Sequence, residues 1–562
     1  MSVSYIKDFH DLAFKEKNNF LKFIYDIGHN GLKKLFKFPG DDFSLWWFTL
    51  IAEKSTLKSG AYAKLIALLL SKGVSKKKTI RDKIKQSFVY NFLSGLYVSI
   101  IFFVKIIYIK FVMRKFHDRR KVLDKNDYLC VSYFPLINKV LAKEGVFENA
   151  YFSSFHKELE KNHHGQYSHV LINITIDQYN LKDTISLAAK FSEKQSLFFI
   201  EEFFRLRHLL LFIYYYAYFS ILFVFNCRFI KKNMFYGYEG QTYNVWDIFK
   251  LDFYRSFCGS NLVTSILYIF LFKGLCESIK SNAKILCICE MQWWEKALYI
   301  FAKKRGNTTI GIQHTIVPEL ILNYFNDPRE MAEGDFVENC PLPDYLATVG
   351  ELPAKLFIKN GWPAEKVFVW GAQRFESLKD VLRSRVLSQG AKDYFVCAFS
   401  IDMVENINIL RLIQKAFSKN PDYKILLKCH PSLNLKTILN KIGLLLERPI
   451  FEFTEEPLSH IMKYAKGMIV TESSSCFYAL AYGLPVVIPL FVDKLDCNPL
   501  SYLSDLPMYA YSAEDLRQRC DKIAATQGDY HMNIRRNDFL RGYLYFPEDG
   551  REYLEKIQQM KN

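Results

Sequence analysis

The 562-residue sequence lacks most of the short motifs that identify nucleotide-using enzymes. It has no Gly-rich P-loop and no GxGxxG fingerprint, which disfavours a kinase and a dehydrogenase. It has no GxSxG elbow, which disfavours a serine hydrolase of that type. Asp327, Asp335 and Asp344 fall in predicted loops, but no DxD motif flanked by apolar residues marks a metal–diphosphate site. We therefore expect a protein that uses no metal ion and no other cofactor.

Cysteine is not arranged in the pairs that bind zinc. The twelve cysteines are scattered from Cys130 to Cys520, and no CxxC spacing occurs. The nearest pair, Cys287 and Cys289, lies in the apolar run ILCIC, where alternate residues of a strand share a face. This pattern predicts buried free thiols and disfavours zinc sites and disulfides. The start of the chain lacks the apolar region of a signal peptide, which predicts a cytosolic protein.

Positive charge and aromatic side chains are in excess. The net charge is +17 and 16% of the residues are aromatic. Both features suit a protein that lies against anionic lipid or handles anionic substrates. A nucleic-acid partner is not expected, because there is no zinc-finger spacing, no RNP-type aromatic pattern and no basic tail. The hydrophobic fraction of 50% and the charged fraction of 24% are ordinary globular values, which excludes disordered and fibrous classes.

Two apolar segments approach the length of a membrane-spanning helix. Residues 86–104 and 209–227 each run for 19 residues without a charged side chain, close to the ~20 that a spanning helix needs. The first continues into Lys105 and Lys110, as a helix lying in the membrane interface would. The second falls between apparent strands of an α/β domain. We expect both to be buried or interface-lying helices, with true spanning as the alternative.

The chain divides into a helical beginning and two α/β series. Residues 1–125 are predicted to be helical, because Lys, Leu and Phe recur at helical spacing. From Asp127 short apolar runs alternate with amphipathic stretches, which predicts a parallel, doubly wound sheet. The runs lie at 128–133, 170–174, 197–200, 285–289, 309–312, 345–348 and 367–369.

A second α/β series starts at about Asp393. Its strands are expected at 394–399, 424–428, 450–453, 467–470 and 485–488, and its helices at 405–418, 435–442, 458–464 and 474–482. The expected fold class is α/β, with two facing Rossmann-like domains and an extra helical N-terminal region. The expected boundaries are 1–125 for the helical region, 126–378 and 392–512 for the two α/β domains, and 513–562 for helices that pack back.

Polar side chains gather at two predicted strand ends of the second domain, where ligands bind in such sheets. One set is Lys428, His430 and Pro431, and the other is Thr471, Ser473, Ser474 and Ser475. The serines would open a helix, whose free backbone N–H groups attract phosphate. A lysine and an imidazole from the neighbouring loop would add a cation and a hydrogen-bond donor. The two sets together predict a clamp for the phosphate of a nucleotide sugar.

These motifs resemble those of a known enzyme class. The C-terminal half is similar to the nucleotide-sugar-binding domain of GT-B glycosyltransferases. It resembles in particular the bacterial sialyltransferases, Kdo transferases and capsule-synthesis enzymes that bind CMP with an HP motif and a serine motif. Polyglycerol-phosphate polymerases that use CDP-glycerol are comparable. Segments 289–325 and 342–378 are similar to bacterial surface-carbohydrate (O-antigen) biosynthesis proteins, and the resemblance extends over about 125–510, with 45–59 also fitting it.

The first α/β domain should supply the acceptor side and the base. Glu290 follows the strand ILCIC and should face the cleft between the domains. A carboxylate or an imidazole is needed to take the proton of an acceptor hydroxyl. The resemblance implies an acidic residue here, although Glu290-Met291-Gln292 departs from the (D/E)(D/E)G form of those families. Glu295, one turn on, and His314, at the next strand end, are the other candidates.

Further side chains are expected around the same cleft. Gln313 and Asn323, with Tyr324, are candidates for the acceptor side. Arg374, at the domain junction, could neutralise the donor phosphate. Since cationic side chains and a helix dipole would then oppose the phosphate charge, we expect metal-independent transfer.

The sequence therefore predicts a GT-B glycosyltransferase at the cytoplasmic face of the bacterial inner membrane. Its partners would be a nucleotide-sugar donor, a lipid-linked glycan acceptor and the anionic membrane surface. By resemblance, the donor is a CMP-activated nonulosonate or Kdo. The alternatives are a polyol-phosphate transferase with a CDP-activated donor, a sugar-nucleotide 2-epimerase, and a non-catalytic scaffold of a polysaccharide-assembly complex.

Overall fold

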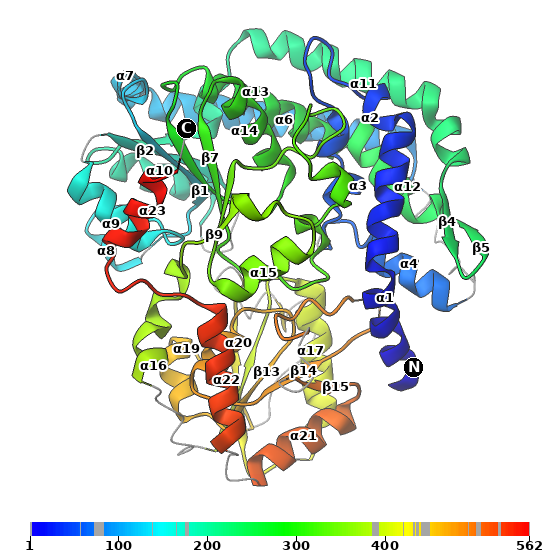
Figure 1. Ribbon diagram of the computed structural model, residues 1–562, viewed down its shortest axis with the longest axis vertical. Helices are drawn as coiled ribbons and strands as arrows, with labels where there is room; N and C mark the ends of the chain where they lie inside the picture. The colour runs from blue at the N-terminus through cyan, green and yellow to red at the C-terminus, as the bar shows by residue number, and fades with distance from the viewer. Residues whose placement is uncertain are drawn as a thin grey trace.

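The computed structural model shows two α/β units stacked along the long axis, with helices around both (Figure 1). The residues it describes are 3–56, 58–71, 84–137, 139–163, 166–174, 179–384, 393–419, 421–430, 433, 438–439, 450–492, 494–501, 507–525 and 530–560. The N-terminal unit and the apolar helices occupy the upper part of the view, and the C-terminal unit occupies the lower part.

The N-terminal unit contains a sheet of seven parallel strands in the order β3-β2-β1-β6-β7-β8-β9. Its central strands are apolar and buried, as strands covered on both faces must be. The strand order reverses between β1 and β6, so the carboxyl ends of these two strands mark the usual ligand position. The strands are β1 (Tyr128–Phe134), β2 (Tyr167–Asn173), β3 (Leu197–Phe199), β6 (Lys284–Ile288), β7 (Thr308–Ile312), β8 (Tyr345–Thr348) and β9 (Val367–Val369).

The helices of this unit include the two apolar segments noted above. These form α6 (Phe88–Met113) and α11 (Arg207–Lys232), each longer than the uncharged segment itself. An unpredicted hairpin, β4 (Phe235–Tyr238) and β5 (Gln241–Asn244), follows α11. The other helices are α7 (Arg120–Leu123), α8 (Lys139–Lys143), α9 (Ser153–Asn162), α10 (Leu181–Phe191), α12 (Trp246–Phe257), α13 (Ser260–Cys276), α14 (Trp293–Lys304) and α15 (Glu351–Lys359).

The C-terminal unit contains a second parallel sheet, in the order β12-β11-β10-β13-β14-β15. Five of its six strands lie where the apolar runs predicted them, and β15 was not predicted. The strands are β10 (Tyr394–Ala398), β11 (Lys424–Lys428), β12 (Phe451–Phe453), β13 (Gly467–Val470), β14 (Val486–Pro489) and β15 (Pro507–Ala510). Its helices are α17 (Met403–Ala416), α19 (Leu458–Ile461) and α20 (Cys476–Ala481). Most of the helix expected at 435–442 lies outside the described residues.

The helical N-terminal region shares the hydrophobic core of the first sheet. Trp46 and Trp47 are fully buried among residues of that sheet, and the Trp47 indole donates to the Phe336 carbonyl at 2.9 Å. The first helix also reaches the C-terminal unit, where Ile6 joins the second core. This region consists of α1 (Val3–Ile27), α2 (Lys33–Leu35), α3 (Leu50–Glu53) and α4 (Ala61–Leu70), with the turns η1 (Gly28–Leu32) and η2 (Leu45–Phe48).

The end of the chain connects the two units. It forms α21 (Ala513–Ala525), α22 (Tyr530–Tyr543) and α23 (Arg551–Gln558). Helix α21 packs on the second sheet, whereas Tyr553 and Ile557 of α23 belong to the first core. The expected fold class is confirmed: two Rossmann-like domains face each other, and an extra helical region precedes them.

Candidate active site

Glu290 is the acidic side chain at the carboxyl end of β6. Its Oε2 accepts hydrogen bonds from the Tyr133 hydroxyl at 3.2 Å and from the Gln292 amide at 2.9 Å. Its Oε1 lies 3.3 Å from Nε2 of His314, which follows the neighbouring strand β7. The Glu290 side chain is 24% exposed. The carboxylate is therefore held by three neighbours and still reaches solvent.

The backbone beside Glu290 forms a strained turn. Met291 is fully buried and has a φ of 53°, a left-handed conformation that costs free energy in a residue other than glycine. The Glu295 carboxylate accepts the backbone N–H of Glu290 at 3.0 Å and that of Met291 at 2.9 Å. Glu295 is 0% exposed, and burial raises its pKa well above the ordinary value. This corrects the expectation of a second base: Glu295 faces the backbone and positions Glu290.

His314 lies behind Glu290 and away from solvent. Its ring is 3% exposed and packs edge-on against Tyr151, with 4.5 Å between the ring centres. Burial lowers the pKa of His314, and this effect exceeds the raising effect of the Glu290 carboxylate. The imidazole is therefore neutral at neutral pH, and its Nε2–H donates to Glu290. Of the two candidate bases, only Glu290 is placed to meet a substrate.

The neighbours of Glu290 keep it ionised. Burial raises the pKa of Glu290, but its interaction with His314, together with the hydrogen bonds from Tyr133 and Gln292, outweighs burial. The net pKa therefore lies below the ordinary value of a glutamate. A carboxylate that is ionised at neutral pH and partly exposed can accept a proton from a bound hydroxyl.

The residues expected on the acceptor side support the Glu290 loop instead. Gln313 is 1% exposed. Its side-chain amide forms hydrogen bonds with backbone groups of neighbouring loops, at 3.1 and 2.8 Å. Asn323 donates to the Glu290 carbonyl at 2.5 Å, and the buried Tyr324 hydroxyl donates to the Cys289 carbonyl at 3.3 Å. Gln313 thus stabilises the neighbouring loops, and Asn323 stabilises the backbone of the candidate base.

Arg374 lies between the two units. It belongs to the short helix η8 (Gln373–Leu378), which packs on α20 through Phe375 and Phe477, with 5.4 Å between their rings. The exposed Arg374 guanidinium lies 5.7 Å from the ring centre of Tyr151. Its charge also acts on His430 of the C-terminal unit. Side chains from both units therefore converge around Arg374.

The first set of the predicted clamp ends β11. Burial and, to a smaller extent, the charge of Arg374 lower the pKa of His430 to about 4, so this imidazole is a neutral donor at neutral pH. The Lys428 ammonium donates to the Glu455 carbonyl at 2.8 Å, and Lys428 is only half-buried. Pro431 lies outside the described residues.

The second set of the predicted clamp, Thr471 and Ser473–Ser475, precedes a shorter helix than the sequence predicted. The Ser475 hydroxyl donates to Ser473 Oγ at 2.9 Å, while Ser473, Ser474 and Ser475 all remain partly exposed. Helix α20 begins only at Cys476 and has six residues. The serines directly precede α20, as expected, but so short a helix sums few peptide dipoles, and the phosphate site stays a prediction. The serine hydroxyls themselves remain available.

Two carboxyl groups lie behind the serine run. Glu472 and Glu405 are hydrogen-bonded to one another, and burial raises the pKa of both. The carboxylate of Glu405 raises the pKa of Glu472 further, because two such close groups do not both ionise readily. Thr471 is buried, and its hydroxyl bonds to Glu405, so it supports this pair. Thr471 is thus placed behind the clamp.

The positive charge near His430 comes from side chains. Arg374 is exposed and Lys428 half-exposed, while His430 adds a neutral donor. In the described part of the chain, no group of three or more His, Cys, Asp and Glu side chains is arranged to hold a metal ion. An anionic ligand here would therefore be met first by a guanidinium and an ammonium group.

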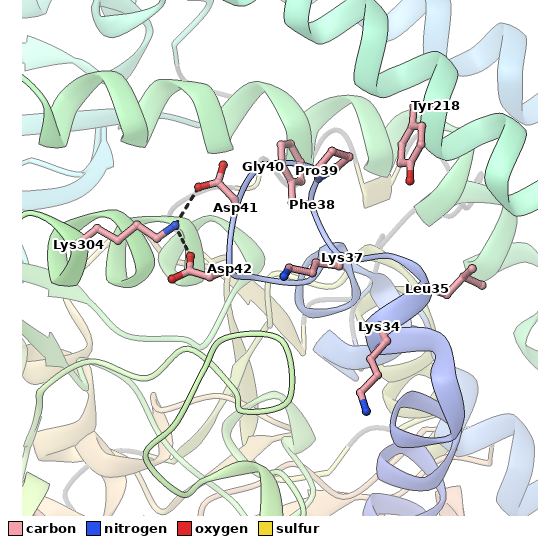
Figure 2. A pocket seen from close by; sticks show the side chains of 10 residues that line it. All are labelled: Lys34, Leu35, Lys37, Phe38, Pro39, Gly40, Asp41, Asp42, Tyr218 and Lys304. Atoms are coloured by element: carbon pink, nitrogen blue, oxygen red, sulfur yellow. Dashed lines mark hydrogen bonds and ion pairs between the residues drawn. The ribbon is translucent and has the colours of Figure 1, made fainter.

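A cavity of about 570 Å³ lies between the helical N-terminal region and the C-terminal unit. Apolar residues of α3, α4 and α12 form a large part of its wall, and Glu472, which precedes the serine run, also lines it. Its lining includes Ile51, Tyr62, Ala67, Phe249, Glu472 and Lys494. A larger, shallow hollow of about 740 Å³ lies elsewhere, beside α11, where Lys304 pairs with Asp41 and Asp42 (Figure 2).

Comparisons with known proteins return only solved structures. No family model and no curated protein matches the sequence. The calicheamicin glycosyltransferase CalG4 is similar over 77% of this chain and 98% of its own, at 9% identity and a TM-score of 0.41. The UDP-GlcNAc 2-epimerase from Methanocaldococcus jannaschii is similar over 77% of this chain and 100% of its own, at 11% identity and a TM-score of 0.40. The wall teichoic acid polymerase TagF is similar over 81% of this chain and 96% of its own, at 12% identity and a TM-score of 0.36.

Several residues of this site escaped the sequence analysis. Tyr133 could have been found, because it lies at the carboxyl end of the strand that pairs with β6. Tyr151 and Gln292 carried no signal of their own. Lys58, from the helical N-terminal region, donates to the Gln292 amide oxygen at 2.7 Å and thereby connects this region to Glu290. Contacts so distant in sequence leave no spacing pattern.

Proposed function

We propose that this protein is a glycosyltransferase that moves a sugar from a nucleotide donor to a lipid-linked precursor of a surface polysaccharide. The observation that carries the proposal is the row of side chains that leads from Glu290 to His430. Glu290 and His314 from the first unit meet Tyr151, which lies beside Arg374, and Arg374 acts on His430 of the second unit. The proposed base thus belongs to one unit, and the proposed phosphate-binding residue His430 belongs to the other.

In the proposed reaction the Glu290 carboxylate takes the proton of an acceptor hydroxyl. The hydroxyl oxygen then forms a bond to the anomeric carbon of the donor sugar. The bond from that carbon to the phosphate oxygen breaks, and the nucleotide leaves with the electron pair. Arg374 and Lys428 oppose the negative charge that grows on the leaving phosphate, and the His430 imidazole donates a hydrogen bond to it.

The proposed donor is CMP-activated, either a nonulosonate or Kdo. Its support is a sequence resemblance: His430-Pro431 and the serine run of this chain match the two motifs with which those enzymes bind CMP. Such a donor leaves as a nucleoside monophosphate, so one guanidinium, one ammonium and a few hydroxyls suffice to neutralise it. The proposal therefore includes transfer without a metal ion.

The proposed acceptor enters through the cavity at α3 and α4. An apolar wall suits the hydrocarbon part of a lipid-linked glycan, and the cavity volume of about 570 Å³ lies in the range of ordinary ligand sites. Glu472 places this cavity beside the serine run, and hence beside the proposed position of the donor. The cell compartment proposed with this acceptor is the cytoplasmic face of the inner membrane.

The clamp is tested by nucleotide binding. We expect the wild-type protein to bind CMP more tightly than CDP, UDP or GDP, measured by calorimetry. Arg374→Ala is expected to weaken CMP binding about 10-fold or more, because a charge-assisted hydrogen bond to phosphate contributes ~1.5–3 kcal/mol. His430→Ala is expected to weaken it less, since a neutral donor is lost. His460→Ala, an exposed histidine of α19, is the matched control.

The outcomes separate the alternatives. Preference for CDP, with phosphorus in the product, would favour a polyol-phosphate transferase. Preference for UDP, with interconversion of the free nucleotide sugar and no need for an acceptor, would favour a 2-epimerase. Absence of binding to all four nucleotides would overturn the proposed function and favour a scaffold.

The acceptor cavity is tested by filling it. Ala67→Trp places an indole in the cavity and is expected to raise the acceptor KM about 10-fold, because the volume for the hydrocarbon chain is lost. Binding of CMP should stay unchanged. Ala364→Trp, at an exposed position of the N-terminal unit, is the control for the added aromatic ring. Equal loss of acceptor use and CMP binding in Ala67→Trp would contradict this assignment.

A further inference from the structure

Helices α6 and α11 are both longer and more apolar than a soluble protein needs at its surface. α6 has 26 residues, and so does α11, which corresponds to roughly 39 Å of helix. Neither contains a single Asp or Glu. By length and composition each could cross a membrane, yet only 28% and 33% of their most apolar windows are buried in the protein. Most of this apolar surface therefore lacks a partner within the described chain.

Each helix nevertheless packs on the protein along its whole length. On α6 one stripe is buried from Asn91 to Met113, and it lies on α13, η4 (Ile200–Phe203), α10 and α12. On α11 a stripe is buried from His208 to Ile230, and it lies on α13 and α12. Most of the buried residues recur every three or four positions, so they lie along one side of each helix. Both ends of each helix thus rest on the same domain.

The opposite side of each helix is apolar and exposed. These side chains would cost free energy in water, at roughly 25 cal/mol for each Å² of apolar surface. On α6 they are Val89, Tyr90, Leu93, Leu96, Tyr97, Ile100, Ile101, Val104, Ile107 and Phe111. On α11 they are Leu210, Leu211, Ile213, Tyr214, Ile221, Val224, Phe225 and Phe229. We refer to these two sets together as the apolar face.

The two helices contact each other directly. The Tyr216 hydroxyl of α11 donates to the Phe92 carbonyl of α6 at 3.0 Å, and the two rings stack at 5.4 Å. Gly95 allows this approach, because a Cβ there would lie 2.3 Å from the Tyr216 oxygen. Phe103 and Phe212 pack edge-on at 5.2 Å further along.

Basic side chains surround the apolar face. Arg228, Lys231 and Lys232 are exposed at the end of α11, and Arg114 and Lys115 are exposed after α6. Beneath α11, the hollow of about 740 Å³ is lined by the exposed Lys34 and Lys37 and by Tyr218, which descends from the helix (Figure 2). Cations beside exposed aliphatic and aromatic side chains match the headgroup layer of an anionic leaflet.

We propose that α6 and α11 form a monotopic membrane anchor, which lies in one leaflet of an anionic bilayer without crossing it. A crossing helix must have its ends on opposite sides of the membrane, whereas both ends of each helix here rest on one folded domain. The occupant of the apolar face is therefore lipid, and the surrounding lysines and arginines meet its headgroups. This inference stands on the two helices and does not depend on the donor nucleotide.

The anchor sets the orientation of the enzyme. The apolar helices lie on the upper part of the molecule, whereas the C-terminal sheet lies at the opposite end of the long axis (Figure 1). The unit with Glu290 would therefore face the lipid, and the unit with His430 would face the cytosol. A lipid-linked acceptor and a soluble nucleotide donor would each approach from its own side.

Flotation of the full-length protein with vesicles tests the anchor. We expect it to float with vesicles of equal parts phosphatidylglycerol and phosphatidylcholine, and to float several-fold less with phosphatidylcholine alone. Leu210→Glu/Phe225→Glu and Ile107→Glu/Phe111→Glu should each reduce flotation at least 10-fold, because a buried carboxylate is costly in hydrocarbon. Ile401→Glu/Phe453→Glu, at exposed positions of the C-terminal unit, is the matched control.

Labelling distinguishes a monotopic anchor from a spanning helix. Leu206→Cys and Asn233→Cys place a thiol at either end of α11, and a membrane-impermeant maleimide is added to inner-membrane vesicles with the cytoplasmic side outward. We expect both thiols to react without detergent, above the background of the native cysteines. Protection of one of them until detergent is added would overturn the monotopic arrangement. A lipid-free dimer that the glutamate variants dissociate would instead assign the apolar face to a second copy of the chain.

Discussion

Glu290→Gln is expected to lower the rate of sugar transfer by about 10²–10⁴-fold, the usual contribution of a general base. Glutamine keeps the shape of the side chain and can still bond to Tyr133 and Gln292. It cannot take up a proton, so the acceptor hydroxyl would have to attack without assistance. The measurement is the turnover of nucleotide donor and acceptor under saturating conditions, together with nucleotide affinity, which should not change.

The control for Glu290→Gln is Glu351→Gln, an exposed acid at the start of α15. It removes one negative charge from the same unit outside the hydrogen-bond network of Glu290. Equal activity of Glu290→Gln and the wild type would refute the assignment of the base. A parallel loss of nucleotide affinity would show instead that Glu290 organises the donor side. The pKa of Glu290 lies below its ordinary value, so the wild-type base should remain ionised throughout the neutral range.

His10→Leu is expected to flatten the loss of stability at acid pH. Burial lowers the pKa of His10 to about 4, well below its ordinary value of 6.5, while a backbone bond to Phe491 acts in the opposite direction. The folded state therefore binds this proton less readily than the unfolded state. Stability from the neutral ring is complete above pH 6.5 and falls as the pH decreases toward 4. The linked loss between pH 8 and pH 5 is about 2 kcal/mol for this one group.

The comparison with the wild type isolates this histidine. Burial also raises the pKa of carboxyl groups such as Glu295 and Glu472, which stabilises the protein at acid pH and opposes the histidines. The measurement is therefore the difference in unfolding free energy between pH 8 and pH 5, obtained with denaturant for each variant. His10→Leu should reduce the acid-linked loss by about 2 kcal/mol, and His460→Leu should leave it unchanged. An identical pH dependence of His10→Leu and wild type would contradict the prediction.

The strands were predictable where they are short, apolar and bounded by polar residues. β8, β9, β11 and β13 lie at the predicted positions, since each is a short run of mostly apolar side chains in a parallel sheet. β15 was missed because three of its four residues are only half-buried, as an edge strand allows. The β4–β5 hairpin was missed because most of its side chains are exposed or half-buried.

The site was only partly predictable, because the sequence does not give the direction in which each side chain points. Glu290 and His314 were placed correctly next to each other, because neighbouring parallel strands end at the same edge of a sheet. Glu295 and Gln313 were misjudged, since the left-handed Met291 and the register of the loops decide where each side chain points. A sequence pattern gives the position of a residue along the chain and carries no record of that direction.

The sequence by itself determined the two-domain α/β architecture, the strand ends that carry Glu290 and His430, and the apolar character of α6 and α11. Hydrophobic periodicity suffices to predict these features, because buried positions recur along one segment with the period of its helix or strand. Only the tertiary structure decided which candidate is exposed, that Lys58 reaches the Glu290 network, and that α6 and α11 rest on one domain along their length. These outcomes depend on contacts between residues far apart in the chain, and such contacts are set by packing.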